Sequence, residues 1–361
     1  MKKTALITGG AGFIGSHTAD ALLKKGYNVR ILDAFTKPVH QYGIPGYLAN
    51  EIEVLRGDVR KRKNIYEALK GADVVFHFAA FQDYLPVFSR YFDVNATGTA
   101  LLYELIVKHN LPIQKLILAS SQAVYGEGTY RCNNGHTVCP SQRSIKSLKK
   151  HQWDFVCPHD GLALKPQWTN EEAKRVPHNS YGISKVAQES IALNLGKRYS
   201  IPTVALRYSI VQGPRQSPFN LYSGVLRVFV THLLAGTSPT IYEDGKQLRD
   251  FINIYDVVKA NILVLEDARA DYQIFNVGSG KTWTVRSFFD IVQKQLNSDI
   301  PPKIDKTFRV GDTRHIFSDI NKIKKLGFAP FRRIEESIGE YAKWVQTLPH
   351  FDKLITSLGK T

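Results

Sequence analysis

Tyr181 and Lys185 are the two residues whose types and spacing most clearly suggest chemistry. They stand four positions apart in a segment predicted to be helical, so their side chains would share one face. A free tyrosine, with a pKa of about 10, stays protonated at neutral pH, and lowering that pKa by about three units requires roughly 4 kcal/mol. A nearby ammonium stabilises the phenolate. Ser120 and Ser121 end a predicted strand, and either could hold a reacting hydroxyl against Tyr181.

A glycine-rich loop near the start of the chain predicts a dinucleotide site. Gly9, Gly12 and Gly15 join a predicted buried strand to a predicted helix, where the backbone can approach a pyrophosphate and the helix N-terminus can bind it. Asp33 ends the next strand, where a carboxylate would bind ribose hydroxyls and repel a 2′-phosphate. These features favour NAD over NADP, and Arg30 does not reverse that preference.

The elements that must position these residues alternate between strands and helices. Apolar strands are predicted at 4–8, 28–33, 53–58, 74–78, 116–120 and 203–208. Helices are predicted at 13–25, around 65–69, and at 96–109 and 181–199. This alternation predicts an α/β fold with a Rossmann-type, doubly wound parallel sheet.

The same pattern predicts two domains. Residues 1–208 would form an NAD-binding domain, interrupted by an insertion at 126–178 that has no clear period. A helix at 254–266 would return to that domain, while 209–253 and 267–361 would form mainly a smaller substrate-binding domain over the C-terminal edge of the sheet.

Composition narrows the class of partner. The 361 residues carry a formal net charge of +16, but Lys and Arg are scattered apart from the run Arg143–Lys150. We interpret this as a basic protein whose positive field draws in anionic substrates, without a nucleic-acid partner. No apolar run is long enough to cross a membrane, and an odd count of three cysteines does not suit a disulfide framework. We therefore expect a cytoplasmic protein.

Several motifs in order resemble the extended short-chain dehydrogenase/reductases, in the NAD-dependent epimerase/dehydratase family. The glycine spacing is Gly-x-x-Gly-x-x-Gly, and it includes Phe13 and Ile14. The other matching segments are Gly57-Asp58-Val59, His77-Phe78-Ala79-Ala80, Asn95–Thr99, Ser120–Gly126, Tyr181–Lys185, Arg249–Ile254 and Phe275–Gly280. The resemblance spans almost the whole chain.

The resemblance implies a set of cofactor contacts. Residues that would hold a tightly bound NAD are Gly9, Gly12, Phe13, Ile14, Gly15, Asp33, Asp58, Val59, Ala79, Ala80, Asn95, Tyr181 and Lys185. It also makes Ser121, rather than Ser120, the catalytic partner of Tyr181 and Lys185.

The two residues after Ser121 indicate which reaction of the family to expect. Dehydratases of the family carry an Asp-Glu pair there, whereas this chain has Gln122 and Ala123, which cannot transfer protons as carboxyl groups do. The resemblance therefore implies a nucleotide-sugar 4-epimerase that inverts carbon 4 of a UDP- or dTDP-linked hexose through a 4-keto intermediate. The alternatives are a nucleotide-sugar 4-reductase or dehydrogenase, and a non-catalytic NAD-binding regulator of the same fold.

Substrate contacts are implied in the same way. Ser121, Gln122, Arg249, Arg309 and Asp312 would bind the nucleotide sugar, and arginine forks suit a diphosphate. Arg314 lies close by and is not ranked, and residues 81–84 would line the sugar pocket. UDP-glucose-type epimerases usually have Asn where this chain has Ser209-Ile210, which places UDP-glucose itself in question. Family analogy also suggests a homodimer through helices 96–109 and 181–199.

The insertion contains two half-motifs of a metal knuckle. Cys132, His136, Cys157 and His159 are the candidate zinc ligands, Asp160 is an alternative and Cys139 is spare. Similar insertions with paired cysteines occur in a subgroup resembling dTDP-L-rhamnose 4-epimerases. Because each half retains one cysteine of its pair, a degenerate knuckle without metal is the other interpretation.

Overall fold

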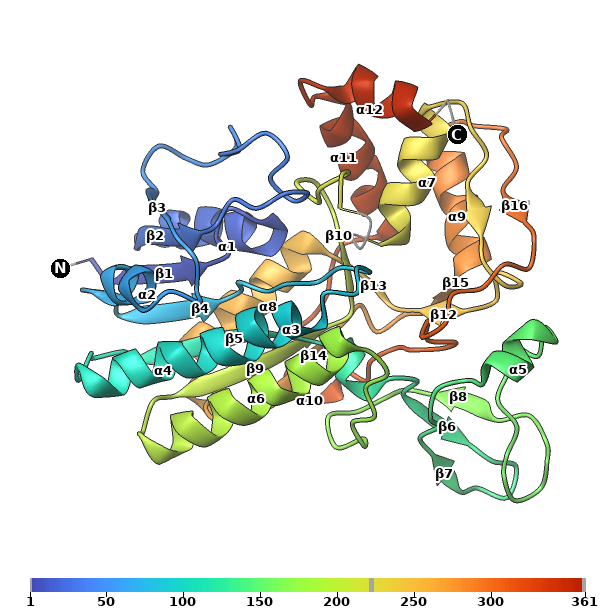
Figure 1. Ribbon diagram of the computed structural model, residues 1–361, viewed down its shortest axis with the longest axis horizontal. Coiled ribbons are helices and arrows are strands. Elements are labelled where there is room, and N and C mark those ends of the chain that lie inside the picture. Colours follow the sequence, from blue (N-terminus) through green and yellow to red (C-terminus); the bar gives the residue numbers. More distant parts are fainter. Residues whose placement is uncertain (1, 221–223, 359–361) are drawn as a thin grey trace.

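The computed structural model describes residues 2–220 and 224–358, and its centre is a seven-stranded parallel sheet (Figure 1). The strand order is β14-β9-β5-β4-β1-β2-β3. The bounds are β1 Thr4–Thr8, β2 Asn28–Asp33, β3 Glu53–Arg56, β4 Val74–His77, β5 Lys115–Ser121, β9 Thr203–Tyr208 and β14 Ile274–Val277. All six predicted strands are present, and the α/β prediction is confirmed.

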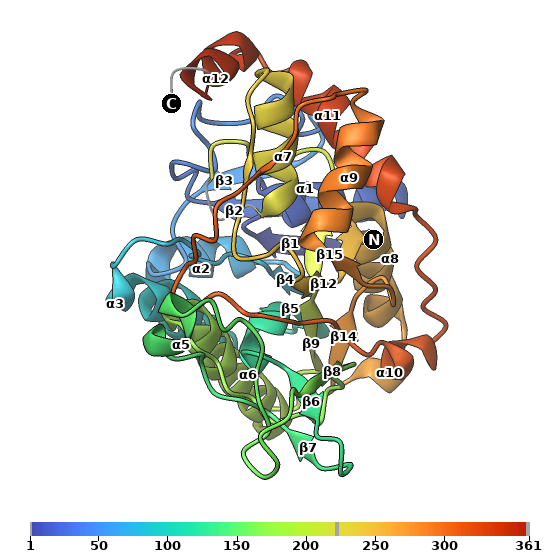
Figure 2. The ribbon, with the colours of Figure 1, turned by 90° about the vertical axis from the view of Figure 1, so that its right-hand side faces the viewer.

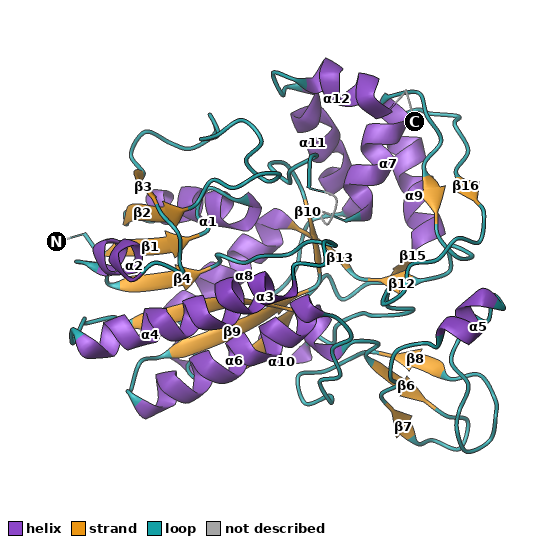
Figure 3. Ribbon diagram, viewed as in Figure 1, coloured by secondary structure: helices purple, strands orange, loops and turns teal. Residues whose placement is uncertain are grey.

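Helices cover both faces of the sheet, as the doubly wound prediction requires (Figures 2 and 3). On one face lie α1 (Phe13–Lys24) and α8 (Ile254–Glu266). On the other lie α2 (Arg62–Leu69), α4 (Gly98–Lys108) and α6 (Ser180–Arg198). Alternate residues of each strand serve the two layers. In β1, Ala5 and Ile7 pack toward α1 and α8, whereas Leu6 packs toward α2 and α4.

One strand of the sheet was not predicted. β14 pairs in parallel with β9 at the sheet edge, with Phe275 and Val277 buried, although it belongs to the segment expected to form mainly the second domain. Its four residues are too short and too polar at Asn276 to stand out as a strand by periodicity.

The sheet positions the candidate site at its C-terminal edge. From β1 the strand order proceeds to β2 on one side and to β4 on the other, which creates a crevice where the two crossovers diverge. The glycine loop follows β1, His77 ends β4, and Ser121 ends the neighbouring strand β5. The short helices α3 (Phe88–Tyr91), η1 (Phe92–Thr97) and η2 (Gln122–Tyr125) continue from these edges.

The second domain packs helices around an apolar core that includes Phe229, Phe288, Phe289 and Ile338. Its helices are α7 (Val225–Leu234), α9 (Val285–Gln295), α11 (Ile334–Gln346) and α12 (Phe351–Leu358). Its paired strands are β10 (Ile210–Gln212) with β13 (Phe251–Asn253), β11 (Thr240–Ile241) with β16 (Lys303–Ile304), and β12 (Leu248–Arg249) with β15 (Trp283–Thr284). The short α10 (Asn321–Lys324) and η3 (Ala268–Ala270) flank β14 and α8.

The insertion between β5 and α6 forms a small antiparallel sheet that projects from the main body (Figure 1). Its strands are β6 (Thr129–Arg131), β7 (Thr137–Val138) and β8 (Lys165–Gln167), and it also carries α5 (Ile145–Lys149). Tyr130, Cys132, Cys157 and Leu164 form its core. All three cysteines are free thiols. Among the described residues, no helix combines the length and the apolar character needed to cross a membrane.

Candidate active site

The glycine loop has the geometry of a close-approach turn. Gly9 has φ of +68°, and a Cβ there would lie 2.8 Å from the Ala79 nitrogen. A Cβ on Gly15 would collide with the Gly9 carbonyl oxygen. Gly12 caps α1 without a side chain, so the first N–H groups of the helix face the crevice, and Phe13 and Ile14 begin the helix. This cradle fits the pyrophosphate of a dinucleotide.

Asp33 lies beside that loop with its carboxylate almost buried. It accepts hydrogen bonds from the Ala11 nitrogen (3.1 Å) and the Phe35 nitrogen (2.9 Å). His40 packs over it, with Nε2 3.6 Å from Oδ1, and burial lowers the pKa of this histidine. Sequence reasoning did not identify His40, because no motif surrounds it. A carboxylate in this position suits ribose hydroxyls, as predicted.

The other predicted cofactor residues line the same edge. Asp58 forms a two-oxygen pair with Arg60, which lowers the pKa of Asp58, and Val59 is buried against Gly98. Ala79 donates its N–H to the Thr8 hydroxyl at 3.2 Å, just before Ala80.

Asn95 ties this edge to the catalytic helix. Its amide exchanges hydrogen bonds with the Phe81 backbone and donates to the Ser184 hydroxyl at 2.9 Å. It thereby joins the loop after β4 to α6. For Asn95 and the other predicted cofactor residues described above, contact with NAD stays a prediction.

Ser121, Tyr181 and Lys185 come together at the end of β5. The Tyr181 hydroxyl hydrogen-bonds Ser121, whose Oγ also accepts from the Ala123 nitrogen at 3.1 Å. The Ser120 hydroxyl instead donates to Glu189 at 2.5 Å, inside the domain. The geometry therefore favours Ser121 over Ser120 as the partner of Tyr181. The Lys185 ammonium lies 5.8 Å from the centre of the tyrosine ring.

The electrostatics of this group differ from the sequence-based expectation. Burial raises the pKa of Tyr181 to about 12, and the hydrogen bond to Ser121 offsets only part of that rise. Lys185 does not lower it, because its ammonium donates to the Ala119 carbonyl (2.7 Å) and to Gln188 Oε1 (2.8 Å). Burial lowers the pKa of Lys185 to about 7. The chain alone thus keeps the phenol neutral.

A buried chain of hydrogen bonds supports Lys185. Gln188 donates to the Thr99 hydroxyl at 3.0 Å, and the ring of His77 lies between Thr99 (3.0 Å) and Thr8 (2.8 Å). Burial lowers the pKa of His77 to about 3, so the ring is neutral at physiological pH. This chain connects the strand before the glycine loop to the lysine.

The predicted substrate residues divide into two kinds. Gln122 is buried and its Oε1 has no hydrogen-bond partner, so it can accept from a ligand hydroxyl. The Arg309 guanidinium lies over the rings of Tyr84 (4.2 Å) and Tyr242 (5.0 Å), and it stands 3.8 Å from Asp312. It is partly exposed and suits a phosphate.

Arg249 is more constrained than its predicted role suggests. Its guanidinium donates to the backbone carbonyls of Leu248 (2.8 Å), Thr313 (2.5 Å) and Arg314 (3.0 Å). Burial lowers its pKa. Part of its fork therefore holds the second domain together.

A dense ion-pair cluster beside Arg249 was missed. Arg143, from the insertion, makes a two-pronged pair with Glu243 at 2.8 and 2.9 Å and donates to the Asp312 carbonyl at 2.8 Å. Arg314 pairs with Glu243 and Asp244, so it is a structural hub. Sequence analysis noted the run Arg143–Lys150 as denser than the rest of the basic residues, but nothing in the run separates buried Arg143 from its solvated neighbours.

The predicted zinc site is not found. Cys132 and Cys157 lie against each other in the core of the insertion, and the rings of His136 and His159 are 5.8 Å apart. Across residues 2–220 and 224–358, no three His, Cys, Asp or Glu side chains converge as metal ligands would. The two thiols instead pack with Tyr130 and Leu164, which corrects the zinc prediction.

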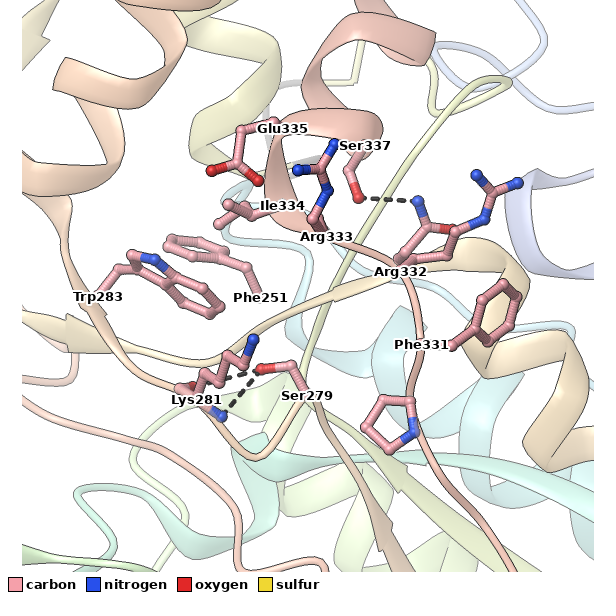
Figure 4. Close-up of a pocket in the computed structure, with 12 residues that line it drawn as sticks. Phe251, Ser279, Lys281, Trp283, Phe331, Arg332, Arg333, Ile334, Glu335 and Ser337 are labelled. Atoms are coloured by element: carbon pink, nitrogen blue, oxygen red, sulfur yellow. Dashed lines mark hydrogen bonds between the residues drawn. The ribbon is translucent and has the colours of Figure 1, made fainter.

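A separate pocket of about 350 Å³ opens on the second domain (Figure 4). Lys281, Trp283 and Phe331 line it, together with Arg333 at the start of α11. Figure 4 shows the Arg332 side chain extending away from Trp283 and Phe251. Arg332 pairs with Glu336 and Glu340. None of the predicted cofactor or substrate residues lines this pocket, so the candidate active site is the crevice at the strand ends.

Comparisons with known proteins identify the family of the chain. A family model described as the NAD dependent epimerase/dehydratase family matches residues 5–145 and 161–278, and its gap lies within the insertion. A dTDP-L-rhamnose 4-epimerase of Burkholderia thailandensis is 31% identical, over 95% of each chain. A putative UDP-glucose 4-epimerase of Methanocaldococcus jannaschii is 32% identical, over 94% of this chain and 98% of its own.

Solved structures give the same result. A UDP-glucose 4-epimerase of Thermotoga maritima with UDP-glucose has a TM-score of 0.78 at 26% identity, covering 95% of this chain and 98% of the other. A UDP-N-acetylglucosamine 4-epimerase of Methanobrevibacter ruminantium, in complex with UDP-N-acetylmuramic acid, has a TM-score of 0.76 at 32% identity, covering 96% and 99%.

Proposed function

The chain belongs to the NAD-dependent epimerase/dehydratase family, and from that premise we propose that it inverts carbon 4 of a UDP- or dTDP-linked hexose. The observation that carries the proposal is the hydrogen bond between Tyr181 and Ser121 beside buried Lys185, at the open end of the glycine loop. Gln122 and Ala123 support epimerisation over dehydration, since neither side chain is a proton-transferring acid.

The chain's own residues divide the work of such an inversion. Ser121 orients the sugar's 4-hydroxyl, and Tyr181 accepts its proton and later returns it. Bound NAD would supply the reversible hydride chemistry at carbon 4 and a positive charge that favours the Tyr181 phenolate. Lys185 holds the ribose hydroxyls, and Asp33 binds the other ribose. Arg249 and Arg309 hold the diphosphate while the 4-keto sugar turns over.

A panel of UDP-, dTDP- and GDP-hexoses tests this proposal. We expect one sugar nucleotide to equilibrate with its 4-epimer, as read by NMR coupling constants, and native mass spectrometry to find NAD bound to the purified protein. Net consumption of NADH with a 4-keto substrate would instead support the 4-reductase. Absence of turnover, with NAD bound, would support the non-catalytic regulator.

We also propose that two copies pair through α4 and α6. The apolar side chains of Phe88, Phe92 and Ile183 are exposed on or beside α6, at 62%, 36% and 44%. Such a cluster suits burial against a second copy. Light scattering should give the mass of a dimer, and Ile183→Lys should shift it to that of a monomer.

We also propose that the enzyme is cytoplasmic, because its three free thiols suit a reducing compartment.

A further inference from the structure

Arg227 is a buried cation without a counter-charge. It lies in the first turn of α7 and is 8% exposed. Among the described residues, Arg227 Nη1 donates to the Pro218 carbonyl at 3.2 Å, and its buried Nε has no hydrogen-bond partner. No carboxylate within the described ranges 2–220 and 224–358 forms an ion pair with it. Removing a guanidinium from water without a partner is costly.

Other buried arginines of the protein show the usual solution. Arg207 pairs with Glu189 at 2.8 Å, and Arg314 pairs with Asp244 at 2.7 Å. Arg143 pairs with Glu243 at 2.8 Å. In each case a carboxylate of the chain offsets the charge. Arg227 has neutral neighbours instead, because the groups that interact with it electrostatically are the hydroxyls of Tyr84 and Tyr341.

The surroundings of Arg227 face the substrate side of the crevice. Tyr84 is close enough to Arg227 to influence it electrostatically, and the Arg309 guanidinium lies 4.2 Å from the centre of the Tyr84 ring. The ten-residue helix α7 begins at Gly224 without a side-chain cap and has no acidic residue in its first turn. Its N-terminal partial positive charge therefore adds to that of Arg227.

We infer that Arg227 binds a phosphate oxygen of the substrate's diphosphate, together with Arg309 and the N-terminus of α7. An anion offsets a buried guanidinium better than a neutral acceptor does, which favours the diphosphate over a carbonyl oxygen of the base. This assignment rests on the proposed function, and it adds a diphosphate-binding residue that none of the sequence motifs includes.

Calorimetric titration of the NAD-loaded protein with UDP, dTDP, UMP and uridine tests the inference. Arg227→Met should weaken binding of the diphosphates about 10- to 100-fold, because a hydrogen bond to a charged group is lost. Binding of uridine should not change, and Arg227→Lys should recover part of the loss. Arg286→Met, on the exposed face of α9, is the matched control and should bind as the unmodified protein does.

A second measurement separates binding from a merely structural role. If Arg227 only supported the fold, Arg227→Met would lower the midpoint of thermal unfolding. If Arg227 is instead a cation that only a bound anion compensates, the midpoint of Arg227→Met without nucleotide should equal or exceed that of the unmodified protein. Equal affinity for UDP or dTDP in both proteins overturns the inference alone. An equal loss for uridine assigns Arg227 to the base and overturns it as well. Failure of the unmodified protein to bind any nucleoside diphosphate overturns the proposed function with it.

Discussion

The two ends of the candidate site handle charge in opposite ways. At the catalytic end, Tyr181 and Lys185 are buried among neutral groups, and burial shifts the pKa of each toward its uncharged form. At the other end, beside Arg249, Arg143 and Arg314 form fixed ion pairs with Glu243; we call this the anion end. A group that must gain or lose a proton cannot be locked in a salt bridge, whereas arginines that only hold the framework beside the proposed diphosphate-binding residues can be paired permanently.

Removing the phenol should have the largest effect on this contrast. Tyr181→Phe should lower kcat about 10²- to 10⁴-fold, because the proton-transfer group is lost while its ring still packs. Epimerisation rate and unfolding midpoint should be measured together. Tyr199→Phe, at the exposed end of α6, is the control and should be unaffected. Undiminished turnover in Tyr181→Phe would show that Tyr181 is not the proton-transfer group.

Breaking the anion end should instead reduce stability. Arg143→Met leaves Glu243 facing Arg314 alone and should lower the free energy of unfolding by about 3–5 kcal/mol, as measured by urea denaturation. Lys146→Met, three residues along in α5, should change it by less than about 0.5 kcal/mol. Similar values for the two variants would mean that the cluster is not a buried network.

The lowered pKa of Lys185 should make stability rise with pH. Between pH 7 and 9 the unfolded chain holds this proton, since its ordinary pKa is 10.5, while the folded chain, with a pKa of about 7, releases it. Stability should therefore rise by about 1 kcal/mol per pH unit in that window. Lys185→Met should flatten this slope. A slope that is unchanged in the variant would show that other groups cause it.

The smallest expected effect is on the pKa of Lys185, which the neutral side chain of Gln188 supports through a hydrogen bond. Gln188 Oε1 accepts a hydrogen bond from the Lys185 ammonium, so Gln188→Leu should lower the pKa of that lysine further. If deprotonation of Lys185 sets the alkaline limb of the plot of kcat against pH, that limb should move to a lower pH by about one unit. The reason is that a hydrogen bond to a charged group is removed. Gln188→Glu should move the limb upward. Movement in the same direction for both variants would contradict this role.

The sequence predicted the parts whose signals are local. Strand periodicity, the glycine loop and the spacing of Tyr181 and Lys185 depend on neighbours within a few residues, and the fold contains all of them where expected. β14 escaped prediction because its four residues, with polar Asn276 among them, are too few to show a strand pattern. Arg143 and Arg227 escaped for a related reason, since burial and pairing across 100 residues leave no local pattern.

The pKa shift of Tyr181 in the chain alone could not be predicted for a different reason. Spacing places Lys185 and Tyr181 on one helical face, but it cannot show that Ala119 and Gln188 take up the ammonium's donors. The candidate zinc site is not supported, because sequence can count candidate ligands without showing that, among the described residues, no three such side chains come together.

The Arg143–Glu243 pair also has a mechanical consequence. Arg143 belongs to the insertion between β5 and α6, whereas Glu243 belongs to the second domain, so the pair is a side-chain link in addition to the backbone connections. A hinge motion between the domains would have to break this ion pair or carry the insertion along with the second domain.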